Sequence, residues 1–279
     1  MTESTARDDT ASASGGPEAL AFDTGTPNSA RMWNYWIGGK DNYAADRAAA
    51  EAVIAAFPVL PVIARHSRRF LVDVVQQLAA DYGVRQFLDI GTGLPTADNT
   101  HEVAQRVAPD SRVLYVDNDP VVLAHARALL TSTPEGETDF IQADLRDTTA
   151  ILAQAARTLD LSQPVAILLI AVLHFIGEQD DPYAIVARLM DAVPAGSYLA
   201  IAHAASDMGT PETQEGFRIY NQRSPVQLAP RSRRQIDRLV AGLDPVGLGV
   251  VPMSEWFGPG QIGVDGADLT GYYCLVRKP

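Results

Sequence analysis

The sequence predicts an α/β fold with a doubly wound, mostly parallel sheet. From residue 84 onward, short apolar runs alternate with segments of helical periodicity, and the run 165–170 is continuously apolar. Such alternation is typical of a parallel sheet with helices on both faces, and a continuously apolar strand fits burial on both sides. A glycine turn at 91–93, between the first strand and the next helix, is the third sign, because ligands of such sheets bind where the strands end.

Each element has its own local signal. Strands are expected where apolar runs cluster, at 86–90, 113–116, 140–142, 165–173, 198–203, 246–251 and 272–276. Helices are expected near 44–57, 62–82, 100–108, 120–130, 148–158, 182–193 and 232–243. The polar, proline-containing stretch 206–230 breaks the alternation, so it is expected to be an irregular insertion. A glycine-rich loop is expected between the last two strands.

The composition limits the class of protein. The chain has 279 residues, 47% of them hydrophobic, and a formal net charge of −12. This balance suits a globular core and disfavours nonspecific binding to nucleic acid or anionic membrane. The single cysteine, Cys274, excludes a disulfide framework, and the five histidines show no metal-ligand spacing, so no metal is expected. The sequence shows neither a membrane-spanning run nor an export signal, so a cytoplasmic protein is expected.

Three regions are expected along the chain. Residues 1–26 are small, polar and acidic and are interpreted as a disordered tail. Residues 27–83 are expected to form an N-terminal helical cap, and 84–279 the domain built on the sheet. The aromatic stretch 33–43 in the cap is interpreted as a lid over a ligand, with Gly38-Gly39 as its hinge or turn. The alternative is a helix packed on the domain, with its aromatic side chains in the core.

The segment FLDIGTGLPTADNTHEV, residues 87–103, is the most informative about chemistry. After a strand that ends in Asp89-Ile90, Gly91, Thr92 and Gly93 form a turn that lets the backbone approach a ligand. The dinucleotide fingerprint G-x-G-x-x-G is incomplete, because Thr96 stands at its sixth position. Asp89 would repel a pyrophosphate but attract an ammonium or sulfonium. S-adenosylmethionine carries both cations and is the expected cofactor.

Two further acids follow the next two strands. Asp117, followed by Asn118, can accept hydrogen bonds from both hydroxyls of a ribose. The alternative is that it caps the next helix, a role that suits Asp119 better. Asp144 can accept a hydrogen bond from the amine of adenine, while the Leu145 N–H donates to a ring nitrogen. Taken alone, Asp144 is equally compatible with a turn residue. Three acids after three successive strands match three groups of one ligand.

At these residues the chain resembles a bacterial family of S-adenosylmethionine-dependent methyltransferases, long catalogued as a domain of unknown function. The resemblance covers nearly all of residues 27–205 and weakens over 206–279. It is carried by SARMWNYWIGGKDNYAADR, FLDIGTGLPTADNTHEVAQRVAPDSRVLYVDNDPVVLAHARALL, ADLRD, AVLHFIGEQDDPYAIVARL and GSYLAIAHA. It implies a class I, Rossmann-like methyltransferase fold with seven strands, the last of them antiparallel. It assigns Asp89, Gly91 and Gly93 to the first cofactor motif, Asp117 to the ribose and Asp144 to the adenine.

Two more cofactor contacts are expected outside this segment. Related enzymes place an arginine from the helix before the first strand at the cofactor's carboxylate, and Arg68 is the candidate here. A solvated arginine is the alternative, since Arg65 and Arg69 are neighbours. Asn42, or Tyr43 beside it, is the candidate contact from the lid.

His174 is the candidate catalytic residue, because it follows the fourth strand, where methyltransferases often meet the substrate. A histidine near its normal pKa can remove a proton from an attacking hydroxyl or amine. A structural hydrogen bond is the alternative, as it is for His203 after the fifth strand. The basic cluster 231–234 is interpreted as a solvated helix start.

The leading hypothesis is methyl transfer to a small molecule bound beneath 206–230 and 252–271, with neither nucleic acid nor membrane as a partner. A non-catalytic sensor that binds S-adenosylmethionine or S-adenosylhomocysteine is the alternative. A nicotinamide-dependent oxidoreductase is disfavoured by Asp89 and by the missing glycine.

Overall fold

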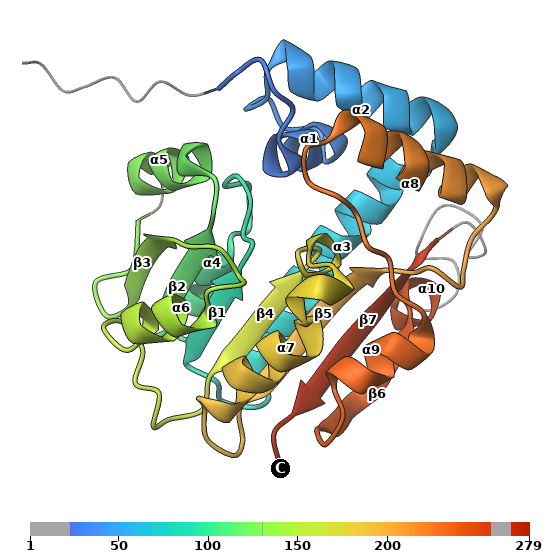
Figure 1. The fold of residues 1–279 in the computed structure, drawn as a ribbon. Helices are drawn as coiled ribbons and strands as arrows, with labels where there is room; N and C mark the ends of the chain where they lie inside the picture. Colours follow the sequence, from blue (N-terminus) through green and yellow to red (C-terminus); the bar gives the residue numbers. More distant parts are fainter. Residues whose placement is uncertain (1–22, 130, 258–268) are drawn as a thin grey trace, which may run out of the picture.

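The computed structural model describes residues 23–129, 131–257 and 269–279, and a seven-stranded sheet forms its centre (Figure 1). The strands are β1 Gln86–Ile90, β2 Arg112–Asp117, β3 Glu137–Gln142, β4 Ala166–Ile170, β5 Tyr198–Ala204, β6 Asp244–Pro252 and β7 Gly271–Arg277. Their spatial order is β3-β2-β1-β4-β5-β7-β6. Strands β1 to β5 are parallel, and β7 is antiparallel to both of its neighbours. The predicted doubly wound, mostly parallel sheet is confirmed.

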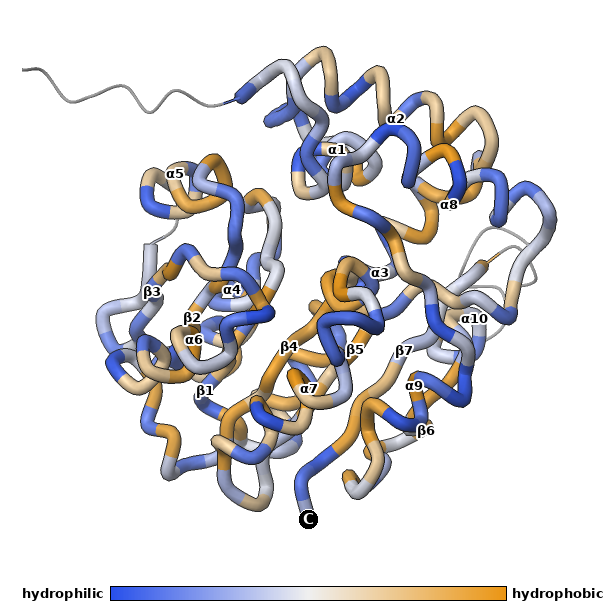
Figure 2. The backbone as a smooth tube through the Cα atoms, in the orientation of Figure 1, coloured by the Kyte–Doolittle hydropathy of each residue, from blue (hydrophilic) through white to orange (hydrophobic). Residues whose placement is uncertain are grey.

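Two apolar cores cover the two faces of the sheet, because successive side chains of a strand point to opposite faces. Phe87 of β1 belongs to the core that includes α3 (Leu60–Ala80) and α4 (Thr100–Val107). Leu88 and Ile90 belong to the other core, whose helices are α6 Thr148–Ala155, α7 Pro182–Asp191 and α9 Arg233–Leu239. Figure 2 shows the hydrophobic strands β4 and β5 at the centre of this arrangement. Two further helices are α5 Pro120–Leu129, beside β2 and β3, and α10 Met253–Trp256, beside β6 and β7.

The carboxyl end of β4 differs from the prediction. The strand ends at Ile170 rather than at 173, and Ala171 has a φ of 58°, in the left-handed region. A short 3-10 helix, Leu173–Phe175, follows, and a second one spans Glu178–Asp180. The apolar run continues past the strand because Leu173 and Ile176 are buried in the loop. A left-handed alanine is strained, and such strain is often found at functional sites.

Three helices lie beyond the carboxyl ends of the parallel strands, and we call them the helical cap: α1 Ser29–Trp36, α2 Ala44–Ala56 and α8 Pro211–Arg223 (Figure 1). Helix α8 packs closely on the end of α2, since a Cβ on Gly216 would lie 2.6 Å from the Cβ of Phe57. The expectation that 206–230 is irregular was wrong for its central part. Thr210 forms a capping box with Thr213 and Pro211 follows as the first helical residue, so the start signals of α8 were present in the sequence.

Some predictions fall outside the described residues: most of the expected tail, 1–22, and most of the expected glycine-rich loop, 258–268. Among the helices that are described, no single one is long and apolar enough to cross a membrane. Helices α2 and α3 pass the same length and composition test only as a pair, bent by 106° at their junction.

Candidate functional site

A cavity of about 940 Å³ lies between the carboxyl ends of the strands and the helical cap. Two groups of lining residues are distinguished below. The acidic rim consists of Asp89, Asp117, Asp119 and Asp144, which follow or end β1, β2 and β3. The cap wall consists of the lining residues of α1, α2, α8 and their adjoining loops, chiefly Trp33, Trp36, Val53, Phe57, Gly216, Phe217, Tyr220 and 225–229.

The glycine turn after β1 lines the cavity as predicted. Gly91 and Gly93 have φ values of 75° and 66°, which favour glycine, and Thr92 lies between them. The Gly91 N–H donates to the carbonyl of Val116, at 2.8 Å. A Cβ on Gly91 would lie 2.3 Å from Cγ2 of Val172, so only glycine fits there without displacing the loop after β4.

Asp117 joins this turn to the end of β2. Its two carboxylate oxygens accept hydrogen bonds from the N–H groups of Gly93, at 2.9 Å, and Asp119, at 3.0 Å. Asp119 caps α5 by accepting from the N–H of Val121, at 2.8 Å, so the capping role belongs to Asp119. Burial raises the pKa of Asp117 to about 6. Asn118, between the two acids, also lines the cavity.

Asp89 is the most buried acid of the rim. It is 4% exposed and accepts a hydrogen bond of 2.6 Å from the hydroxyl of Thr100, the first residue of α4. Burial raises its pKa to about 6, although Thr100 and the nearby Arg68 oppose the shift. Two carboxylates with raised pKa values therefore face one cavity, where a cationic or hydrogen-bond-donating ligand would stabilise their charged forms.

Asp144 follows β3 at the edge of the cavity. It lines the cavity, and it is also a turn residue, because it accepts the N–H of Arg146 at 2.8 Å. Its second oxygen lies 3.0 Å from Nη1 of Arg146. Nε of the same arginine lies 3.0 Å from a carboxylate oxygen of Asp180. Leu145 is buried and lines the cavity beside it.

Arg68 reaches the cavity from α3, unlike its exposed neighbours Arg65 and Arg69. Its Nη2 donates to the carbonyls of Asp98, at 2.7 Å, and Ala97, at 3.2 Å. Its Nε is buried and has no hydrogen-bond partner within the described part of the chain. Burial lowers the pKa of this guanidinium and Asp89 opposes the shift.

The expectation that Asn42 reaches the site is not met, because Asn42 is absent from the lining of this cavity. Its Nδ2 donates to Oδ1 of Asn34, at 2.9 Å, and to the carbonyl of Gly39, at 3.0 Å. Arg47 donates to the side-chain oxygen of Asn42, at 3.1 Å. These bonds occupy Asn42 in the turn between α1 and α2.

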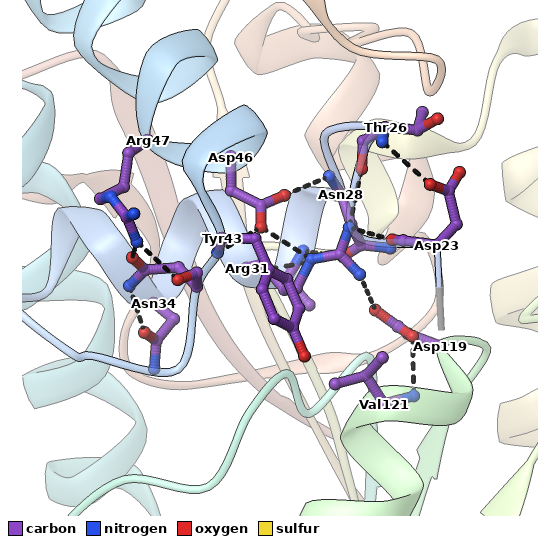
Figure 3. A network of polar contacts seen from close by, with 12 residues as sticks. Asp23, Thr26, Asn28, Arg31, Asn34, Tyr43, Asp46, Arg47, Asp119 and Val121 are labelled. Carbon is purple, nitrogen blue, oxygen red and sulfur yellow. Dashed lines mark hydrogen bonds and ion pairs between the residues drawn. The ribbon is translucent and has the colours of Figure 1, made fainter. Parts of the chain in front are cut away.

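A polar network inside the cap was not foreseen from the sequence (Figure 3). Arg31 of α1 is 3% exposed, and its Nε donates to Asp46 of α2 at 2.8 Å. Its Nη2 donates to the carbonyls of Asp23 and Thr26. Its Nη1 lies 3.9 Å from Oδ2 of Asp119. The buried ion pair fixes α1 on α2, and the longer contact joins the cap to the acidic rim.

His174 lines the cavity after β4, as predicted, but its environment differs from that of an ordinary histidine. It is 6% exposed, and its Nδ1 is buried without a hydrogen-bond partner among the residues described. Burial and the positive charge of Arg231 lower its pKa to about 3. His174 is therefore neutral near pH 7 and is a weak base.

The expectation that Arg231 is solvated was wrong, because the residue is buried. It is 1% exposed and donates to the carbonyls of Ile176, at 2.6 Å, and Leu173, at 3.1 Å. It also contacts Nε2 of His203, at 2.9 Å, and Glu178, at 3.1 Å. Because Nδ1 of His203 is 2.8 Å from the carbonyl of Ala204, that histidine accepts from Arg231 through Nε2. Arg231 thus holds the loop after β4 against β5.

Comparisons with known proteins agree with this geometry. The seven-stranded, mostly parallel sheet with its antiparallel β7 is the class I methyltransferase fold. Residues 16–279 match the family described as S-adenosyl methyltransferase, and the chain belongs to this family. The family predicted from the sequence is confirmed, and with it the cofactor, S-adenosylmethionine.

Two solved structures are similar over almost their whole length. One is a DUF574-family protein from Streptomyces avermitilis: 42% identity, TM-score 0.88, 92% of this chain and 99% of that one. The other is a putative methyltransferase from Thermobifida fusca: 38% identity, TM-score 0.84, 92% of this chain and 96% of that one. An O-methyltransferase family protein from Burkholderia thailandensis, at 17% identity and a TM-score of 0.50, covering 92% of this chain and 65% of that one, shares the fold alone. A search of curated proteins found no match.

Proposed function

We propose that this protein is an active methyltransferase that transfers the methyl group of S-adenosylmethionine to a small molecule. One observation carries the proposal: a single cavity of about 940 Å³ is lined by the acidic rim on one side and by the largely apolar cap wall on the other. The smallest pockets for drug-sized ligands measure roughly 300 Å³. A cavity of about 940 Å³ is therefore large enough for a cofactor and a small acceptor side by side. A sensor needs no such second compartment.

The residues of the rim fit the cofactor group by group. In this proposal Asp117 accepts hydrogen bonds from the ribose, and Asp144 and the Leu145 N–H contact the adenine. Asp89 and the turn of Gly91, Thr92 and Gly93 surround the methionine part, with Asn118 beside the ribose. The unpartnered Nε of Arg68 supports its assignment to the cofactor's carboxylate, since a buried donor without an acceptor is costly.

The protein's contribution to the reaction is mainly alignment and exclusion of water. When bound, S-adenosylmethionine supplies a methyl group already activated by the sulfonium, and its carbon–sulfur bond breaks with the electron pair remaining on sulfur. The cap covers the cavity as a lid, with α1 held on α2 by Arg31 and Asp46. We assign to His174 the role of accepting a hydrogen bond from the attacking hydroxyl or amine of the substrate. Because its pKa is about 3, it takes the proton of that group only when the proton becomes acidic during the attack.

Thermal melting with S-adenosylmethionine, S-adenosylhomocysteine and NAD in parallel tests the cofactor step. At about one hundred times its dissociation constant a ligand adds about 2.7 kcal/mol of stability, which raises the melting temperature by several degrees. The first two ligands should produce this rise and NAD should not. Asp117→Ala should abolish the rise, whereas Asp110→Ala, which removes an exposed acid paired with Arg85, should preserve it. An undiminished rise in Asp117→Ala would refute the ribose assignment.

Turnover is tested separately, with labelled S-adenosylmethionine and a panel of metabolites. His174→Ala should reduce transfer to the acceptor so found while leaving the affinity for S-adenosylhomocysteine nearly unchanged. Unchanged transfer would remove His174 from the mechanism, and the absence of transfer to any compound would favour the sensor.

A further inference from the structure

The cap wall is the part of the cavity that the proposed cofactor contacts do not use. Its large side chains come from separate segments: Trp33 and Trp36 of α1, Phe57 after α2, and Phe217 and Tyr220 of α8. Phe175, in the loop after β4, continues the wall and stacks on Tyr220, with ring centroids 6.1 Å apart and planes 24° apart. Aromatic rings therefore form the main surface that a second ligand would meet.

The polar atoms of the two buried aromatic residues are already satisfied within the protein. Trp36 donates from Nε1 to the carbonyl of Ala50, at 3.3 Å, and Tyr220 accepts from the hydroxyl of Ser224, also at 3.3 Å. Trp33, Phe175 and Phe217 are only half-buried, although all three line the cavity. The large side chains of the wall thus offer mainly ring faces and edges, beside a few polar side chains such as that of Gln227. Ring surfaces favour aromatic partners by about 0.5–1.5 kcal/mol per pair beyond the area buried.

Charge is confined to the other side of the cavity. The charged lining residues are Arg68, Arg146 and the four acids of the rim, whereas the cap wall has none among its described residues. Placing an ionised group against an apolar wall without a partner is costly. The compound that fits beside the cap is therefore uncharged.

Two polar atoms at the edge of the wall lack partners. Nδ1 of His174 and the hydroxyl of Thr270 are buried and make no hydrogen bond within the described ranges, and both residues line the cavity. The His174 ring lies beside Phe175, with centroids 4.4 Å apart. A hydroxyl or amine on a ring held by the wall would lie close to these groups.

We propose that the methyl acceptor is an uncharged, planar aromatic compound with a hydroxyl or amine substituent, held by the rings of the cap wall. This inference rests on the proposed methyltransferase function and adds the chemical class of the acceptor. Its basis is the pairing of a charge-free aromatic wall with unpartnered polar atoms at its edge.

A matched set of ligands tests the inference by calorimetry or equilibrium dialysis, with and without saturating S-adenosylhomocysteine. The ligands are 2-naphthol, its saturated counterpart decahydro-2-naphthol, and 6-hydroxy-2-naphthoate, which is anionic at neutral pH. We expect 2-naphthol to bind at least tenfold more tightly than either of the others. Equal or tighter binding of the saturated or the anionic compound, or no binding of 2-naphthol up to 1 mM (roughly −4 kcal/mol), would overturn the inference.

Variants locate the binding. Phe217→Ala should weaken 2-naphthol at least fivefold, whereas Tyr82→Ala, which removes an exposed aromatic that does not line the cavity, should change nothing. Leu228→Lys should invert the preference towards the naphthoate, while the volume-conserving Leu228→Met keeps it. If Phe217→Ala and Leu228→Lys both bind 2-naphthol as tightly as the native chain, the cap wall is not the binding site. Failure of S-adenosylhomocysteine to bind would instead refute the proposed function itself.

Discussion

The acidic rim and the cap wall face the same cavity but are built in opposite ways. The rim is polar and carries two carboxylates, the buried Asp89 and the half-buried Asp117, whose pKa values are raised to about 6. Their charged forms are therefore unfavourable until a ligand compensates them. The cap wall is apolar, uncharged in its described residues, and packed through ring contacts such as that between Phe57 and Phe217, 6.4 Å apart. Ligand binding at the rim therefore depends on charge, and ligand binding at the wall depends on shape. A single substitution should affect one of them without the other.

Arg231 belongs to neither the rim nor the wall but holds the loop after β4 that lines the cavity, and its loss should have the largest effect on stability. Arg231→Met leaves two carbonyls and Nε2 of His203 without their donor, and each buried group left unpaired costs about 1–3 kcal/mol. We expect the free energy of unfolding to fall by about 4 kcal/mol, measured by urea denaturation. The neighbouring Arg233→Met, at an exposed arginine paired with Asp237, is the control and should cost less than about 1 kcal/mol. Equal losses in the two variants would contradict the structural role of Arg231.

The raised pKa of Asp89 gives the next largest effect, and it acts on the rim alone. Its folded-state pKa of about 6 lies above the ordinary value of 3.8, so the folded state holds more protons between about pH 4 and pH 6. The Asp89 contribution therefore decreases the stability of the ligand-free protein as pH rises through that window. Asp89→Asn removes this contribution.

The stability of Asp89→Asn relative to the native chain should accordingly rise by about 2–3 kcal/mol between pH 4 and pH 7. Denaturation curves at several pH values measure this difference, and the variant Asp110→Asn, at an exposed acid away from the cavity, is the control. A difference that does not change with pH would show that Asp89 titrates normally.

The smallest expected effect is a change in the titration of His174. Its pKa of about 3 predicts an imidazole that stays neutral from pH 8 to pH 5, which NMR of the ring carbons can follow. Arg231→Met should raise this pKa because it removes the positive charge, whereas Arg231→Lys keeps the charge and should leave it low. A His174 that titrates near 6.5 in the native chain would contradict the buried, neutral state.

Much of the rim could be predicted from the sequence, because each of its parts is local. Asp89, Gly91 and Gly93 lie within five residues. Asp117 ends β2 and Asp144 closely follows β3, so strand–turn–helix patterns already bring these residues to one edge. Asp144 also lines the cavity as expected, although its salt bridge with Arg146 needed the structure to be seen.

The cap wall could not be predicted in the same way, since it is assembled from segments that are far apart in the chain. Phe57 and Gly216 meet because α8 crosses α2, and no local pattern encodes that contact. The burial of Arg231 escaped prediction for a similar reason: three arginines in four residues are usually solvated, and only the loop after β4 supplies the carbonyls that bury this one. The hydrogen bonds of Asn42 with Asn34 of α1 and Arg47 of α2 depend on how these two helices meet, so the sequence did not reveal that its side chain is occupied there.

The missing side chain at Gly216 has a consequence for how this cavity can diversify. The distance between α8 and α2 is set by the backbone of Gly216, because even a methyl group there would lie 2.6 Å from Cβ of Phe57. A single added carbon at this position would push the helix outward and enlarge the chamber, with every residue at the sheet edge left intact. A substitution at this one position could thus change which sizes of methyl acceptor bind, while the residues proposed to bind S-adenosylmethionine stay the same.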